Sequence, residues 1–305
     1  MLRPQFTQTL VKTLEKQSVN VYGEAGQGQD RLVKDIAKLM QQDGWLVLSL
    51  DMKSWAQDYQ GMVNSLSSQV RRQLPAVTQP LQDMAEVVAA LDEHAAQTGV
   101  LLALEHFDAL LDNYHLDKNY INFFSHLNSF RNQANRSLLV ITAKPHGHSK
   151  MYANDDIRNT SLLDLKCFEL RKLSYEEIKT EIQKCAPQLD ESTLGQLKLA
   201  IYKHPRSFEF LEHCLIQISL GYDREKSFAK RLKLWKSSFE RDHKKGLRRI
   251  LEKMQNWLAI VGKEMGNLSL KLKVAGASVF GLFALFIDAF IKGKPLFDTL
   301  TGWMK

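Results

Sequence analysis

The residues best suited to chemistry in this sequence follow a short apolar segment near the N-terminus. Gly23 and Gly28, with Gly26 between them, have the spacing of the phosphate-binding motif G-x-x-x-x-G-K-[ST]. In that motif, backbone N–H groups of the loop and the start of the following helix hold phosphate oxygens. The spacing predicts a strand, a phosphate-binding turn and a helix beginning near Arg31. An ordinary strand–turn–helix without a ligand is the alternative.

The two positions after the glycines depart from this motif. Gln29 stands where a lysine would reach the β- and γ-phosphates, and Asp30 stands where a serine or threonine would bind magnesium. An amide carries no charge, and a carboxylate at short range would repel a triphosphate by on the order of several kcal/mol. Asp30 does suit the start of a helix. The sequence therefore predicts a loop that keeps its backbone shape and has lost its nucleotide chemistry.

A second group of candidate residues ends the apolar stretch GVLLALEHFD. Glu105, His106 and Asp108 follow a predicted buried strand, and open α/β sheets bind ligands at the carboxyl ends of their strands. In an active site, Glu105 would hold a metal ion, and His106 or Asp108 would orient or deprotonate a water molecule. The alternative interpretation, which we favour, is that polar residues fill a vacated catalytic position.

Two further segments carry polar groups of interest. The apolar stretch at 137–143 predicts a strand ending near the hydroxyl of Thr142. Residues 144–159 form a predicted polar loop with His146 and His148. His-x-His spacing can bind a metal ion, but no nearby cysteine or carboxylate completes a ligand set. We therefore predict loop histidines and no metal site.

Residues from about 6 to 220 resemble AAA+ and STAND-type P-loop ATPases. The resemblance is carried, in the family's order, by GEAGQGQD, LLALEHFD, LLVITA, ELRKLSYEEI with a helix-capping box at Ser174 and Glu177, and HPRSFEFLEHCL. It implies a parallel-sheet α/β P-loop NTPase-like (ASCE/AAA+) domain at 1–170, ending in a strand near 167–170. A small helical lid domain at 171–221 would follow.

The same resemblance implies roles for individual residues. ATP and magnesium would be the cofactors, Thr142 would sense the γ-phosphate, and Arg206 of the lid would face phosphate. Arg206 as a surface arginine is the equal alternative. The family also implies oligomerisation or switching driven by nucleotide. Because both departures, at Gln29 and Asp30, fall on nucleotide chemistry, we expect no cofactor and no ATP turnover.

Composition fits a globular protein of more than one domain. The chain has 305 residues, of which 44% are hydrophobic and 25% charged. Its cysteines are scattered and lack metal-ligand spacing, so the sequence predicts neither a disulfide framework nor a cysteine metal site. The three are Cys167, Cys185 and Cys214.

The positive charge is concentrated in one segment. Residues 223–273 contain 15 Lys or Arg and 6 Asp or Glu, whereas the whole chain has a net charge of +7. Apolar residues recur there at helical spacing, so we predict a basic amphipathic helical linker at 222–268. The segment at 223–253, which contains the strongest basic patch, could bind nucleic acid or an anionic membrane surface. The alternative is a helix face that only contacts solvent. That patch consists of Lys244, Lys245, Arg248 and Arg249.

An apolar segment follows the linker. Residues 274–291 contain a single charged side chain, Asp288, and lysines flank them on both sides. A helix of this length spans about 27 Å, enough to cross the hydrocarbon core of a bilayer. We predict a transmembrane helix at 269–292 and a short tail at 293–305. The basic flank predicts single-pass insertion into the inner (cytoplasmic) membrane with the N-terminal domain in the cytoplasm.

Four residues of the apolar segment share one helical face. Ala277, Gly281, Ala284 and Asp288 are spaced by four, three and four positions. Small residues allow membrane helices to approach closely, and an acid inside a membrane faces other helices or water. The stripe predicts a homo-oligomer, and chance spacing in an apolar segment is the alternative.

Three functions compete on this basis. The first is a membrane-anchored AAA+/STAND-like sensor or scaffold without catalysis, which oligomerises or binds a partner protein and signals to the membrane. Bacterial anti-phage defence systems combine such parts, an analogy at the level of fold only. The second is a membrane-tethered ATP hydrolase with an altered site, and the third is a nucleic-acid-binding adaptor.

Overall fold

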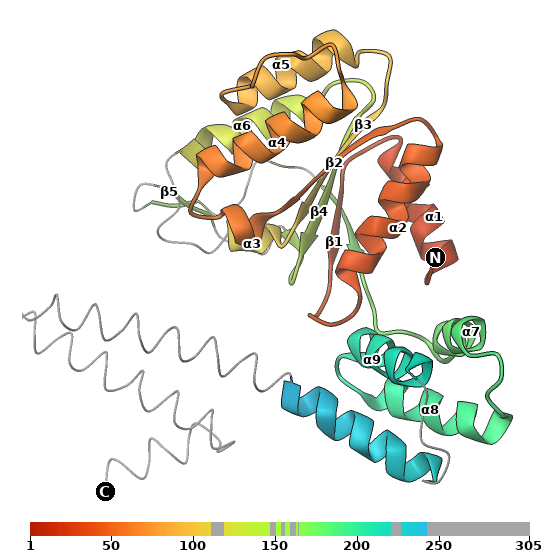
Figure 1. The fold of residues 1–305 in the computed structure, drawn as a ribbon. Coiled ribbons are helices and arrows are strands. Elements are labelled where there is room, and N and C mark those ends of the chain that lie inside the picture. Colours follow the sequence, from red (N-terminus) through yellow and green to blue (C-terminus); the bar gives the residue numbers. More distant parts are fainter. Residues whose placement is uncertain are drawn as a thin grey trace, which may run out of the picture. The chain divides into compact units, whose positions relative to one another are not determined.

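A computed structural model describes residues 1–110, 119–146, 151–153, 156–158, 163, 165–220 and 227–242. The chain divides into two compact units, Met1–Lys236 and Ser237–Lys305. The first unit contains all the strands and helices that carry labels in Figure 1.

The first unit is built on a five-stranded parallel sheet with the strand order β2-β3-β4-β1-β7. The strand register places Tyr22 at the end of β1 between Thr142 of β4 and Glu169 of β7. It also places Asp51, at the end of β2, beside Glu105 at the end of β3. The strands are β1 (Val19–Tyr22), β2 (Leu46–Asp51), β3 (Val100–Glu105), β4 (Arg136–Thr142) and β7 (Lys166–Glu169).

Helices cover both faces of this sheet, as Figure 1 shows. On one face α1 (Pro4–Leu14) and α2 (Gln29–Gln42) pack over β1, β3 and β4. On the other face lie α4 (Tyr59–Gln73), α5 (Met84–His94) and α6 (Asn119–Arg131). Coverage on both sides explains why the strands are nearly continuous apolar runs rather than alternating ones.

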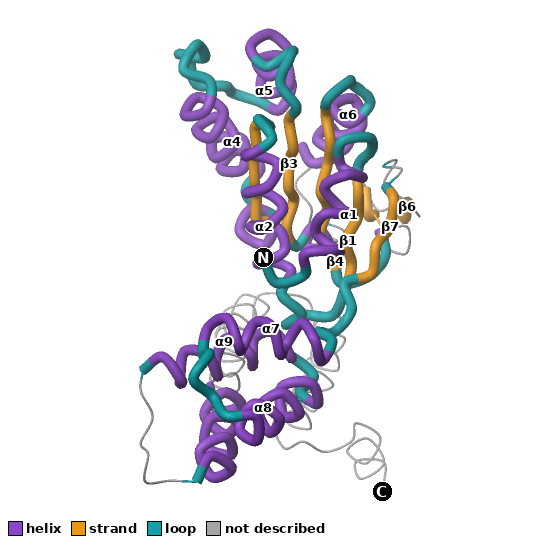
Figure 2. Tube along the Cα trace, turned by 90° about the vertical axis from the view of Figure 1, so that its right-hand side faces the viewer, coloured by secondary structure: helices purple, strands orange, loops and turns teal. Residues whose placement is uncertain are grey.

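Short elements complete the unit. The one-turn α3 (Met52–Trp55) follows β2, the 3₁₀ turn η1 (Phe107–Ala109) follows β3, and β5 (Met151–Ala153) pairs antiparallel with β6 (Asp156–Arg158). Figure 2 shows three helices grouped beyond the sheet: α7 (Tyr175–Cys185), α8 (Glu191–Lys203) and α9 (Ser207–Ser219). The predicted capping box at the start of α7 is confirmed, because the side chains of Ser174 and Glu177 each accept the other's backbone N–H.

Two predictions about local structure were wrong. The helix expected to begin near Arg31 begins at Gln29, because Gly28 takes a left-handed conformation (φ 88°) and caps it directly. The expected polar loop at 144–159 contains β5 and β6. His146 in that segment is buried, with its ring centroid 5.8 Å from that of Phe107.

Several predictions lie outside the described residues. These are the linker at 222–268 outside 227–242, including its basic patch, the transmembrane helix at 269–292 with its small-residue stripe, the tail at 293–305, and His148. Among the residues that the structure does describe, no helix is long and apolar enough to span a membrane.

Candidate functional site

The glycine loop after β1 has the compact shape that the sequence predicts. Gly26 and Gly28 have φ angles of 85° and 88°, which side chains rarely adopt. A Cβ atom at Gly26 would lie 2.8 Å from Cβ of Arg206, and one at Gly28 would lie 2.8 Å from the ring of Phe208. The loop therefore packs directly against the start of α9, and glycine is required at both positions.

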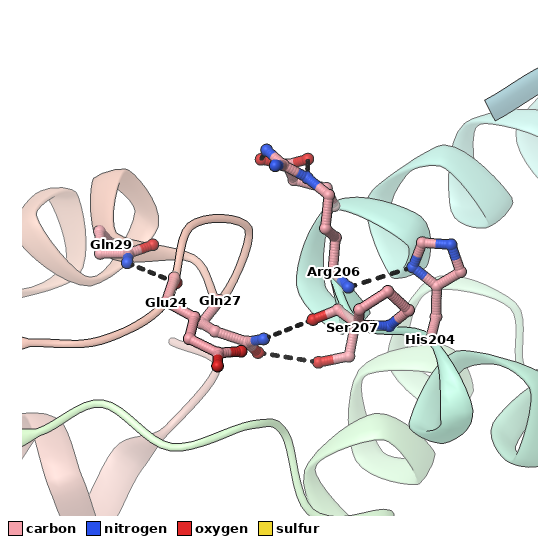
Figure 3. Close-up of polar contacts among 8 residues, drawn as sticks. Glu24, Gln27, Gln29, His204, Arg206 and Ser207 are labelled. Carbon is pink, nitrogen blue, oxygen red and sulfur yellow. Dashed lines mark hydrogen bonds and ion pairs between the residues drawn. The ribbon is translucent and has the colours of Figure 1, made fainter. Parts of the chain in front are cut away.

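Gln29 closes the loop on itself. Its side-chain Nε2 donates hydrogen bonds to the backbone oxygens of Gly23 (3.1 Å) and Glu24 (2.7 Å), the second of which is drawn in Figure 3. The amide at the position of the motif's lysine thus binds the carbonyl groups of its own loop.

Gln27 joins the loop to the start of α9. Its buried Nε2 donates to the backbone oxygen of Pro205 (2.7 Å), and the Ser207 hydroxyl donates to its Oε1 (3.0 Å), as Figure 3 shows. Each such bond contributes about 0.5–1.5 kcal/mol net. Protein groups therefore connect the glycine loop to the start of α9.

Arg206, which the family resemblance would place at phosphate, pairs with an acid of its own helix. Its Nε and Nη2 atoms each lie 2.6 Å from a carboxylate oxygen of Glu209. A bidentate pair of this kind is among the stronger interactions between charged side chains. In this arrangement the positive charge of Arg206 is neutralised beside the loop.

Two carboxylates interact at the predicted metal and phosphate position. Glu105 ends β3, and its Oε1 accepts a hydrogen bond from the Ser49 hydroxyl (3.2 Å). Burial raises the pKa of Glu105 most, and the nearby charge of Asp30 raises it further. The negative charge of Asp30 thus acts on Glu105, and the two carboxylates repel each other.

The raised pKa of Glu105 predicts how a neutral substitution should behave. In the unfolded chain Glu105 loses its proton at lower pH than in the folded protein, so its charge costs stability above the folded pKa. We expect Glu105→Gln to be more stable than the wild type at pH 8. Below about pH 4.5, where the unfolded carboxyl is protonated, that advantage should vanish. Urea unfolding of both proteins at pH 8 and pH 4 measures this, and an advantage of equal size at both pH values would contradict it.

His106 is oriented by an acid on the neighbouring strand. Its Nδ1 lies 2.9 Å from Oδ1 of Asp51, which also accepts the Lys53 N–H (3.1 Å) at the start of α3. His106 has a left-handed backbone (φ 51°, ψ 41°), a conformation that is uncommon outside glycine. Asp108 lies in η1, two residues further on.

Thr142 is held within the sheet by a residue that the sequence analysis did not select. Its hydroxyl accepts from Nδ2 of Asn20 (2.8 Å) and donates to the backbone oxygen of Lys144 (2.5 Å). Asn20 is fully buried in β1, and its Oδ1 accepts the backbone N–H of His146 (2.9 Å). Asn20 is a polar residue between the apolar Val19 and Val21, and this break in the apolar strand was the signal that could have identified it. The missed Gln27 and Ser207 gave no comparable signal.

A groove of about 590 Å³ borders the loop between the starts of α2 and α9. Its charges are mixed: Lys34 and Arg31 of α2 face Glu212 of α9, whose pKa is raised chiefly by burial. Within the described part of the chain, no three His, Cys, Asp or Glu side chains are grouped so as to hold a metal ion.

Solved structures decide the fold. The Walker-type ATPase PABY2304 of Pyrococcus abyssi is similar with a TM-score of 0.57 and 12% identity, over 82% of this chain and 76% of that one. The ORC1 protein of Aeropyrum pernix, solved in complex with DNA, is similar with a TM-score of 0.51 and 16% identity, over 79% of this chain and 66% of that one. The fold is that of an AAA+ P-loop NTPase.

A third AAA+ neighbour is the ORC2 protein of Aeropyrum pernix, solved in ADPNP–ADP complexes. Its TM-score is 0.51 at 14% identity, over 77% of this chain and 67% of that one. No protein-family model and no curated protein matches the sequence. Identities this low establish the AAA+ fold alone, so function has to be argued from the residues of the site.

Proposed function

We propose that this chain is an AAA+-fold sensor and scaffold that does not hydrolyse nucleotide and acts at a membrane. Its AAA+ module would bind a partner protein or further copies of the chain. The segment at 269–292 would anchor it in the inner membrane as a single-pass helix, with the module in the cytoplasm. Anti-phage defence is the setting that fold-level analogy suggests.

The observation that carries the proposal is at the glycine loop, where Asp30 lines the groove beside Gln29 and its negative charge acts on Glu105 at the end of β3. A magnesium–triphosphate is bound by a lysine and by a hydroxyl that ligates the metal. Here the amide of Gln29 is engaged by loop carbonyls, and Arg206 is paired with Glu209. The side chains present therefore do not fit the phosphates of ATP.

The contact between loop and lid supports the same proposal. Gln27 binds Pro205 and Ser207 directly, so the start of α9 is held to the loop by protein atoms. A module of this kind needs no bound phosphate to bring its lid to the loop. We infer that its conformation responds to protein partners rather than to nucleotide.

Restoring the motif tests the nucleotide half of the proposal. We expect the full-length wild type in detergent to bind a fluorescent ATP analogue with magnesium more weakly than about 1 mM. The double variant Gln29→Lys/Asp30→Thr should gain at least about tenfold in affinity, and Gln29→Lys alone should gain less, because Asp30 remains. Micromolar binding by the wild type, or wild-type hydrolysis that Glu105→Ala abolishes, would refute the proposal.

Cell fractionation tests the membrane half. The sequence of 269–292 supports it, together with the small-residue stripe that favours self-association. We expect the full chain in the membrane fraction and a chain lacking 269–305 in the soluble fraction. Deletion of 293–305 alone is the matched control and should leave the protein at the membrane. A full chain recovered only in the soluble fraction would refute the anchor.

One observation favours a second candidate, an ATP hydrolase with an altered site. The carboxylate of Asp51 contacts Nδ1 of His106 and orients the ring. A histidine that acts as a general base is often oriented in this way. This candidate requires hydrolysis by the wild type that His106→Asn reduces by about a hundredfold or more. Hydrolysis that is absent, or unchanged in His106→Asn, excludes it.

The nucleic-acid adaptor rests on the basic patch of the sequence, and the ORC1 neighbour of Aeropyrum pernix was solved in complex with DNA. It requires salt-sensitive binding of DNA or RNA that is lost when the patch is neutralised. The four positions to neutralise are Lys244, Lys245, Arg248 and Arg249.

A further inference from the structure

Strand β7 lies at an edge of the sheet, as Figure 2 shows. Its backbone donates from Lys166 to Ser18 (3.2 Å) and from Leu170 to Tyr22 (2.7 Å) on the β1 side. Successive residues of a strand point their hydrogen-bonding groups in opposite directions. The N–H and C=O groups of Cys167 and Glu169 therefore point away from β1. Among the described residues, no strand pairs with this side of β7.

A groove of about 530 Å³ runs along β7 and the chain that follows it. Its apolar wall is formed by Phe6 of α1 and Phe168 of β7, whose rings meet edge to face with centroids 6.5 Å apart. Phe168 is only partly buried. The groove thus offers an aromatic surface for an apolar side chain, beside backbone groups that can pair with a strand.

Charged side chains form the rim. Arg171 and Lys172 are exposed there, Lys166 is exposed beside Phe168, and Glu169 forms an ion pair with Arg171 (3.1 Å). Lys166 also places its Nζ 5.5 Å from the centroid of the Phe168 ring. A second acid of the groove, Glu177, forms an ion pair with Arg3 (3.7 Å). With both acids paired, the positive charges of Lys172 and Lys166 remain in excess, and the rim is complementary to negative charge.

We propose that the open edge of β7 binds an extended, acidic segment of a partner protein. The segment pairs with the backbone of Cys167 and Glu169 as an added strand, the mode known as β-augmentation. One aromatic or aliphatic side chain of the segment packs on Phe6 and Phe168, and its acidic residues lie against Lys166 and Lys172. This surface is separate from the glycine loop, so the proposal stands or falls independently of nucleotide binding.

A labelled peptide of the sequence Asp-Glu-Val-Phe-Val-Asp-Glu is a suitable probe. We expect saturable binding to the full chain in detergent, with a dissociation constant in the range of roughly 10–100 μM, measured by fluorescence anisotropy. Cys167→Pro removes the outward N–H together with the thiol and should weaken binding about tenfold or more. Cys167→Ala keeps that N–H and should bind as the wild type does.

Two further changes separate this mode from other binding. A peptide with lysine in place of its acids should bind at least about tenfold more weakly, and Lys172→Glu should weaken binding of the acidic peptide. Because Lys172 is exposed, Lys172→Glu should fold, and it provides the test if Cys167→Pro does not fold. The proposal is overturned if the wild type shows no saturable binding, or if neither Cys167→Pro nor Lys172→Glu weakens it. It is also overturned if Cys167→Pro disrupts only self-association, since a second copy would then occupy the edge.

Discussion

Replacing Gly28 with alanine is expected to destabilise the AAA+ module by about 2–5 kcal/mol. Two costs add at this position. The left-handed backbone (φ 88°) is unfavourable for alanine, and its Cβ would lie 2.8 Å from the ring of Phe208. Phe208 must then shift and disturb the hydrogen bond between Gln27 and the neighbouring Ser207. Urea unfolding of the full chain in detergent, followed by tryptophan fluorescence, measures the loss.

Gly44 provides the matched control for this prediction. It has a similar φ of 82°, but a Cβ atom there would meet nothing within 4 Å. Gly44→Ala should therefore cost only the backbone term, about 1 kcal/mol. If Gly28→Ala and Gly44→Ala lower the free energy of unfolding equally, Phe208 at the start of α9 does not restrict a side chain at position 28.

Acidification is expected to remove about 3 kcal/mol of stability through His146 alone. Burial lowers the pKa of His146 to about 4, and the side chain is only 4% exposed. Above pH 6.5 the residue is neutral in both the folded and the unfolded chain, so it adds no pH dependence. As the pH falls from 6.5 to 4, the unfolded chain takes up a proton that the folded protein excludes, and stability falls.

His146→Gln removes this titration and should flatten the pH dependence between pH 6.5 and 4. Urea unfolding of the wild type and of His146→Gln across this pH range measures the two slopes. An identical slope for wild type and His146→Gln would mean that burial of this ring does not exclude its proton.

The parts of the fold that the sequence predicts are those set by local patterns. Continuous apolar runs such as 100–104 identify strands of a sheet covered on both faces, and the glycine spacing locates the loop after β1. The capping box at Ser174 is equally local. Such signals depend on residues a few positions apart, which is why they survive in a chain with only 12–16% identity to its structural neighbours.

The contacts of the site depend on residues far apart in the chain. Gln27 and Ser207 are separated by 180 positions, and Asn20 reaches Thr142 across 122. No periodicity reports such pairs. The same reason explains why the residues at 144–159 were predicted as a loop, although His146 packs on Phe107 of a distant turn. The partners of Gln29 and Arg206 are close in sequence, but the sequence analysis assigned both positions by the phosphate-binding motif and not by these contacts.

Calorimetric titration of the wild-type chain with magnesium–ATP tests the central claim most directly. If Asp30 and Glu105 exclude phosphate, and Gln29 and Arg206 are held by other partners, no saturable heat should appear at ATP concentrations up to about 1 mM. Stoichiometric binding in the micromolar range would contradict the account.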